Sequence, residues 1–201
     1  MDITLVNFMN EQLSLVSLDF KRYMYEKLPW EARFVGLMGP RGVGKSTMIL
    51  QRIKEMAEAD QQHTLYISAD HSYFTTHTLV DIADEFVRGG GKWLFIDEVH
   101  KYDGWSRELK QIYDSHPELH IFFTGSSVLD ILEGEADLSR RALLFDMQGL
   151  SFREYLELFH GIKTPVRSLE DVLDGNTRIE GILHPIPLFN KYLREGYYPF
   201  A

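Results

Sequence analysis

One stretch of nine residues carries the residue types that hold a phosphate group. It fits the pattern Gly-x-x-x-x-Gly-Lys-Ser and consists of Gly39, Pro40, Arg41, Gly42, Val43, Gly44, Lys45, Ser46 and Thr47. Glycines allow the backbone to curl so that several N–H groups point at one anion. In the phosphate-binding P-loop of this spacing, the lysine reaches the β- and γ-phosphates of a nucleotide and the serine hydroxyl binds Mg²⁺. Lys45 and Ser46 are therefore the first candidates for binding ATP and its metal ion.

Two adjacent carboxylates form the second candidate. Residues 92–98 are an apolar run that ends in Asp97 and Glu98, which is the form of a Walker B element. Asp97 is expected to hold Mg²⁺ through water, because this ion keeps much of its hydration shell. Glu98 is expected to face the γ-phosphate, where a carboxylate can orient or deprotonate the attacking water. An acidic turn after a strand is common by itself, but its position downstream of a P-loop favours the catalytic interpretation.

Four further side chains have two interpretations each. Thr124 and Ser126 lie at the end of the apolar run 120–124, where a short polar side chain can touch the γ-phosphate or the attacking water; the Gly-Ser-Ser sequence there would equally cap a following helix. Arg140 and Arg141 precede another apolar run. An arginine from the same chain or from a neighbouring subunit can stabilise charge on the transferring phosphate, whereas paired surface arginines are more often simply solvated. Because both arginines precede a strand, we expect one of them to act on a neighbouring subunit.

Alternating strands and helices must position these residues. The apolar run 34–38 predicts a buried strand before the glycine loop, and residues 48–57 predict a helix after it. Further strands are expected at residues 64–68, 92–98, 120–124 and 142–147. Further helices are expected at residues 79–87, 105–113, 128–132, 151–160, 168–173 and 186–194. Residues 3–28 have apolar positions in steps of three and four and predict one or two amphipathic helices that stop near Pro29.

Composition limits the class of protein. The chain has 201 residues, of which 44% are hydrophobic and 25% charged, enough for one α/β domain with a small appendage. Its net charge of −9 provides no overall basic field for nucleic acid. Without cysteines it can form neither disulfides nor thiolate metal sites. No run approaches eighteen apolar residues and no signal peptide is visible, so we expect no membrane span and a cytoplasmic location.

The order of these motifs, followed by Leu-Ser-Phe-Arg-Glu-Tyr-Leu at 150–156, resembles the AAA+-like ATPases of bacteria and archaea in which an AAA domain precedes a domain of unknown function. Residues 97–105 resemble the Walker B element and following loop of that family, residues 123–127 its sensor strand, and residues 192–199 the start of its C-terminal part. The resemblance covers nearly the whole chain. It implies that Thr124 or Ser126 is the sensor and that Arg140 or Arg141 is the finger or sensor arginine.

The same resemblance implies an α/β fold of the P-loop NTPase type. This is a three-layer α/β/α sandwich with a five-stranded parallel sheet of order 5-1-4-3-2, an N-terminal helical segment and a small helical C-terminal extension. We expect residues 1–160 to form the ATPase domain, with the helical segment at 1–30. Residues 161–201 are expected to be a helical linker and the start of a truncated C-terminal domain.

These features predict Mg²⁺-dependent binding and hydrolysis of ATP by a molecular switch or motor that releases ADP and can form a homo-oligomer. The alternative is a nucleotide-dependent module with slow or no turnover, which binds a protein or DNA target through the missing C-terminal domain.

Two other classes of P-loop enzyme fit the sequence less well. A helicase would need a second motor domain, and a small-molecule kinase would need an acceptor site; neither is visible. The guanine-reading Asn-Lys-x-Asp pattern is absent, which favours ATP by elimination.

Overall fold

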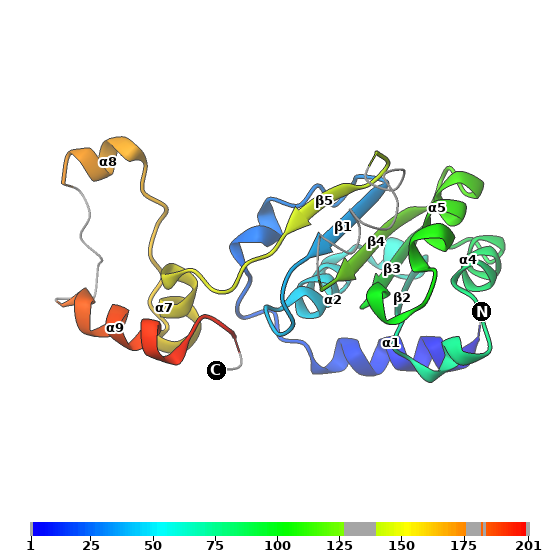
Figure 1. The fold of residues 1–201 in the computed structure, drawn as a ribbon, viewed down its shortest axis with the longest axis horizontal. Helices are drawn as coiled ribbons and strands as arrows, with labels where there is room; N and C mark the ends of the chain where they lie inside the picture. Colours follow the sequence, from blue (N-terminus) through cyan, green and yellow to red (C-terminus); the bar gives the residue numbers. More distant parts are fainter. Residues whose placement is uncertain (1, 127–139, 176–181, 183, 200–201) are drawn as a thin grey trace. The chain divides into compact units, whose positions relative to one another are not determined.

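Figure 1 presents the fold as a computed structural model, which describes residues 2–126, 140–175, 182 and 184–199. The chain forms two compact units, Met1–Gln148 and Gly149–Ala201. Within the described ranges, no helix is long and apolar enough to cross a membrane. The short helix expected at 128–132 lies outside the described residues.

A parallel sheet of five strands forms the centre of the first unit. The strands are β1 Phe34–Met38, β2 Thr64–Ser68, β3 Trp93–Asp97, β4 His120–Gly125 and β5 Leu143–Asp146. Their order across the sheet is β2-β3-β4-β1-β5, and every neighbouring pair is parallel. This is the order 5-1-4-3-2 read from the other edge, so the predicted topology is confirmed. The C-terminal ends of β3, β4 and β1 consequently lie side by side, with β4 in the middle.

The burial of the strands follows from helices that cover both faces of the sheet. Every residue of β1 and β3 is buried, as expected for central strands of a parallel sheet. On one face, alternate strand residues join the core with apolar side chains of α4 (Leu79–Arg88) and α5 (Trp105–Ser115). On the other, α1 (Ile3–Leu15) contacts both β2 and α2 (Lys45–Glu55). The predicted three-layer α/β fold is confirmed.

Short helices complete the first unit. They are η1 Tyr23–Glu26, α3 Glu58–Gln61, η2 Ser72–Thr75 and η3 Val99–Lys101. One or two helices were expected at residues 3–28: α1 ends at Leu15, Val16 is already extended, and the short η1 follows before Pro29. The helix after the glycine loop begins at Lys45, three residues before the expected start, since the loop leads directly into its first turn.

The second unit contains α7 Phe152–His160, α8 Leu169–Leu173 and α9 Pro185–Glu195. Ser151 and Glu154 form the predicted capping box at the start of α7. Two hydrogen bonds tie α9 to the α7 region: the Tyr155 hydroxyl donates to Glu195 Oε2 at 2.5 Å, and the Tyr192 hydroxyl donates to the Leu150 carbonyl at 2.7 Å. That residues 161–201 begin a further domain remains a prediction.

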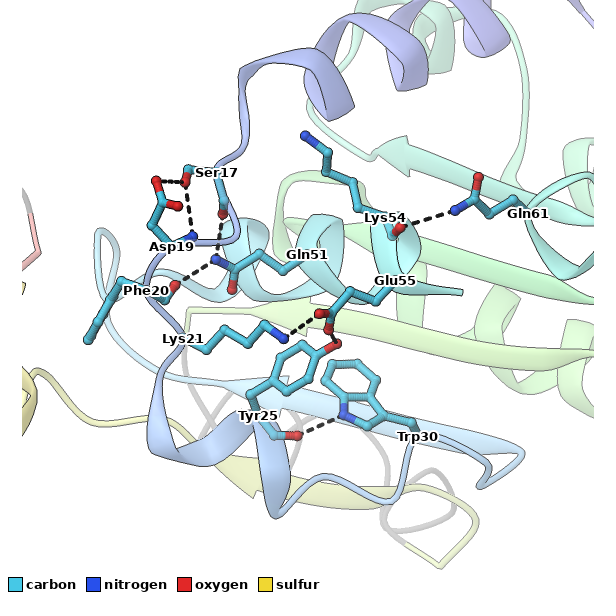
Figure 2. A network of polar contacts seen from close by, with 10 residues as sticks. All are labelled: Ser17, Asp19, Phe20, Lys21, Tyr25, Trp30, Gln51, Lys54, Glu55 and Gln61. Carbon is cyan, nitrogen blue, oxygen red and sulfur yellow. Dashed lines mark hydrogen bonds and ion pairs between the residues drawn. The ribbon is translucent and has the colours of Figure 1, made fainter. Parts of the chain in front are cut away.

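A buried glutamine joins α2 to the segment that follows α1 (Figure 2). Gln51 is 3% exposed, and its Nε2 donates to the carbonyl oxygens of Ser17 and Phe20, both at 2.8 Å. These two carbonyls belong to residues outside any helix, so they need a partner elsewhere. One side-chain amide therefore satisfies both and holds the N-terminal segment in its extended course.

Glu55, one turn further along α2, makes the second attachment (Figure 2). Its Oε1 lies 2.5 Å from Lys21 Nζ, and its Oε2 accepts from the Tyr25 hydroxyl at 2.5 Å. The Trp30 indole donates to the Tyr25 carbonyl at 2.7 Å and continues the network toward β1. The helix that begins with Lys45 is thus held at its far end by the N-terminal segment.

We expect Gln51→Met to lower the free energy of unfolding by about 1–3 kcal/mol. The substitution keeps the size of the side chain but leaves two carbonyl groups without their donor. The matched control is Gln111→Met on the exposed side of α5, which should change the free energy by less than about 0.5 kcal/mol. Urea denaturation of both variants measures the difference, and equal effects would contradict the role given to Gln51.

Candidate functional site

The glycine loop has a backbone that only glycine accommodates at its start. Gly39, Gly42 and Gly44 all have positive φ, at 144°, 81° and 98°. A Cβ on Gly39 would lie 2.2 Å from the carbonyl oxygen of Met147, which follows β5. The Met147 N–H donates to the Met38 carbonyl at 2.8 Å, so the end of β5 is fixed against the start of the loop.

Lys45 lies folded against this loop. The side chain is buried, and its Nζ donates to the carbonyl oxygens of Gly39 at 2.7 Å and Pro40 at 2.9 Å. Burial lowers the pKa of the ammonium, while the nearby Asp97 and Glu98 carboxylates raise it. These carbonyls accept from two of the three ammonium N–H groups. The loop that follows β1 therefore holds the partly desolvated Lys45 ammonium near two carboxylates from the end of β3. Beyond it, in the first turn of α2, Ser46 is half-buried and Thr47 is exposed.

Asp97 ends β3 as a carboxylate that is 4% exposed and hydrogen-bonded on both oxygens. Its Oδ2 accepts from the Tyr66 hydroxyl at 2.8 Å, and its Oδ1 accepts from the Thr124 hydroxyl. The Thr124 oxygen in turn accepts from the backbone N–H of Glu98 at 3.0 Å. A fully buried threonine of β4 thus connects both predicted acidic residues.

Glu98 is the one non-glycine residue of the described ranges with positive φ, at 54°. Such a conformation is rare for a residue with a Cβ and costs about 1–3 kcal/mol. Its Oε2 lies 3.5 Å from Arg41 Nη2 of the glycine loop and 3.9 Å from His100 Nε2. The strained backbone therefore turns the carboxylate out of the strand direction and toward the loop.

Of the two polar candidates at the end of β4, Thr124 contacts the acidic residues directly. Ser126 follows the strand and is half-buried. The helix that it was alternatively expected to cap lies outside the described residues. Thr124 is therefore part of the site, whereas no contact among the described residues links Ser126 to the acidic residues.

Both candidate arginines precede β5 and lie away from the glycine loop of their own chain. Arg141 pairs with Asp114 near the end of α5, with Nε to Oδ1 at 3.1 Å and Nη2 to Oδ2 at 3.3 Å. Arg140 is exposed. Because β5 runs parallel to β1, its first residue lies at the opposite end of the strands from Gly39. Neither arginine is therefore brought together with Lys45, Asp97 and Glu98 in the same subunit.

Two residues outside the predicted motifs also contact the site. Tyr66, with its hydroxyl on Asp97, is one of them. The other is Arg22, 5% exposed, whose guanidinium donates to the Val43 carbonyl in the glycine loop and, at 2.8 Å, to the Gln148 carbonyl. Neither residue lies in a motif, and both reach partners far along the chain, so local patterns carried no signal for them.

The residues present fit a nucleoside triphosphate with a hydrated metal ion. The glycine loop leaves no room for a Cβ at Gly39, a buried ammonium lies against it, and a fixed carboxylate lies close by. No cluster of three or more metal-ligating side chains occurs in the part of the chain that the structure describes. Mg²⁺ does not require such a cluster, because it binds through one or two carboxylates together with substrate phosphates and water.

Comparisons with known proteins agree with this geometry. The family model described as "AAA domain" matches residues 31–156. An uncharacterized protein of Methanocaldococcus jannaschii is 32% identical over 184 residues, which cover 82% of this chain and 38% of the relative. The chain thus spans well under half the length of this relative.

Solved structures with a similar fold include two of Hsp104. The Hsp104:casein complex of S. cerevisiae in its extended conformation has a TM-score of 0.53 at 21% identity, covering 96% of this chain and 38% of that chain. A closed-state reconstruction of Hsp104 with ATPyS and FITC casein also has a TM-score of 0.53, at 18% identity. The match covers 77% of this chain and 34% of that chain. At these identities the likeness establishes the fold.

We expect Gly39→Ala to destabilise the protein more than Gly104→Ala does. Both glycines have positive φ, but a Cβ on Gly104 would meet nothing closer than Arg107 Nη2 at 3.9 Å. The control carries the cost of a left-handed backbone alone, about 1–2 kcal/mol. Gly39→Ala adds a larger backbone cost, because its φ of 144° lies outside the left-handed region that side chains tolerate, and roughly 1–3 kcal/mol of steric overlap. Chemical denaturation of the two variants compares them; equal losses would mean that the Met147 carbonyl does not confine the loop.

Proposed function

The chain belongs to the AAA domain family, and on this basis we propose that it binds Mg²⁺ and ATP and hydrolyses the bond between the β- and γ-phosphates as a molecular switch or motor. Family membership supports nucleotide binding. The observation that carries the finer proposal is that Lys45 lies near the carboxylates of Asp97 and Glu98. The Thr124 hydroxyl connects these two acidic residues to each other.

Each residue has a defined part in the proposed reaction. The N–H groups of the glycine loop and the Lys45 ammonium bind the phosphates. Ser46 and Asp97 would hold Mg²⁺, which when bound offsets negative charge on the phosphates. Glu98 accepts a proton from water as the water oxygen bonds to the γ-phosphorus, and the bond to the bridging oxygen breaks to release ADP. Thr124 fixes the backbone of Glu98 and so directs its side chain.

A second candidate is a nucleotide-dependent interaction module with slow turnover. The contact that favours it is the one between Glu98 Oε2 and Arg41 Nη2 at 3.5 Å. An oxygen of Glu98 that pairs with Arg41 is engaged by a cation of its own chain and not by the attacking water. In either case, we propose that a protein or DNA target is engaged through a further C-terminal domain, as the family resemblance implies, and that the protein acts in the cytoplasm.

We expect Glu98→Gln to retain ATP binding and to lose hydrolysis by about 10²–10⁴-fold, because the amide cannot accept the proton of water. Phosphate release and calorimetric titration with ATP measure the two properties separately. The matched control is Glu118→Gln, which removes an exposed carboxylate before β4 and should change neither. Lys45→Ala should instead weaken binding itself.

Hydrolysis by Glu98→Gln at the wild-type rate would exclude Glu98 as the base. Unchanged affinity of Lys45→Ala for ATP would remove the assignment of the glycine loop as the phosphate site.

We further propose that Arg140 or Arg141 acts on the γ-phosphate bound by a neighbouring subunit, which would make the active form a homo-oligomer. The double variant Arg140→Ala/Arg141→Ala is mixed with Glu98→Gln, and partial recovery of ATP hydrolysis is expected because each supplies what the other lacks. Asp114→Ala is the control, since it removes the partner of Arg141 but retains both arginines, and it should remain active. Mixtures that assemble by light scattering and stay inactive would contradict action in trans.

A further inference from the structure

Tyr66 contacts the Asp97 carboxylate from the neighbouring strand. It lies in the middle of β2, is 2% exposed, and its hydroxyl donates to Asp97 Oδ2 at 2.8 Å. In the register of the two strands Tyr66 is opposite Phe95, so Tyr66 and Asp97 are on the same face and diagonally adjacent. This diagonal separation suits a long side chain that reaches forward along the strand.

Two donors from opposite sides fix the plane of the Asp97 carboxylate. Tyr66 approaches from β2 and Thr124 from β4, one on each oxygen. Each carboxylate oxygen has two lone pairs, so one on each oxygen remains for a further ligand. A phenol has an O–H to donate and a carboxylate oxygen accepts, so Tyr66 is the donor in this contact. The carboxylate is thus held in one orientation with acceptor capacity left over.

Tyr66 is itself held in place by α1. Its ring stacks on that of Phe8 with centroids 6.0 Å apart and an interplanar angle of 12°, and its backbone N–H lies 3.3 Å from Met9 Sδ. Phenylalanine would fill the same space and make the same ring contact. The hydroxyl group therefore has one identified partner, Asp97, and its contribution can be separated from the packing of the ring.

We propose that Tyr66 is a positioning residue for Asp97 in the complex with Mg²⁺ and ATP, an inference that rests on the proposed function. Because Thr124 alone would leave the carboxylate free to rotate about one hydrogen bond, the second donor sets the direction of the remaining lone pairs. A hydrogen-bond partner of a metal-binding residue typically contributes about 10–100-fold to metal affinity or activity.

The test compares Tyr66→Phe with Tyr25→Phe. Tyr25 provides a matched control because its hydroxyl also donates to a carboxylate, that of Glu55 (Figure 2). Glu55 ends α2, whereas Lys45 of the site begins it. The affinity for a non-hydrolysable ATP analogue is measured by calorimetry with Mg²⁺ and again with EDTA. We expect both variants to match the wild type in EDTA, and the gain in affinity due to Mg²⁺ to fall about tenfold in Tyr66→Phe alone.

The outcomes separate this inference from the proposed function. A gain from Mg²⁺ that is unchanged in Tyr66→Phe would overturn the inference and leave the proposed function standing. Equal loss of affinity with and without Mg²⁺, or failure of Tyr66→Phe to fold by circular dichroism, would overturn it too, because the hydroxyl would then serve the core. A wild type that binds the analogue under neither condition would overturn both.

Discussion

A buried carboxylate must be hydrogen-bonded, and much of the first unit follows from this requirement at Asp97. An unpaired charge at a site that is 4% exposed would cost several kcal/mol. Its donors come from two other strands, Tyr66 on β2 and Thr124 on β4, so β3 has to lie between these two strands. The strand order β2-β3-β4 therefore places a hydrogen-bond donor on each side of the Asp97 carboxylate.

Thr124 extends the arrangement to the rest of the site. Because β4 also pairs with β1, the strand that supports Asp97 lies beside the strand that leads into the glycine loop. The Thr124 oxygen accepts from the N–H of Glu98, whose left-handed backbone ends β3 and turns its side chain toward Arg41 of the loop. The N-terminal segment holds α2 from the other side through Gln51. Lys45, the first residue of α2, is thus placed by the sheet on one side and by the N-terminal segment on the other.

The sequence predicted the parts of this site whose signals are local. The glycine pattern predicts the loop, and the apolar runs before the loop and before Asp97 and Glu98 predict β1 and β3. The helix after the loop was also predicted, but its start was placed three residues too late. Tyr66 and Arg22 could not be found in this way, because their partners lie 31 and 21 or more residues away. Apolar spacing over residues 3–28 predicted one or two helices, and α1 and the short η1 are both present. The extended segment between them was not predicted, because the hydrogen bonds from Gln51 to the Ser17 and Phe20 carbonyls come from a distant part of the chain. Whether the arginines before β5 serve a neighbouring subunit depends on assembly, which no local pattern encodes.

Steady-state release of phosphate by the wild-type protein tests the central claim most directly. ATP in large excess over protein is supplied with Mg²⁺ and, separately, with EDTA, and GTP is used in a parallel series. We expect many phosphates released per protein molecule with ATP and Mg²⁺, and none above background with EDTA. Release of no more than one phosphate per molecule would contradict an ATP-hydrolysing enzyme and favour the interaction module, and equal rates with GTP would contradict the choice of ATP.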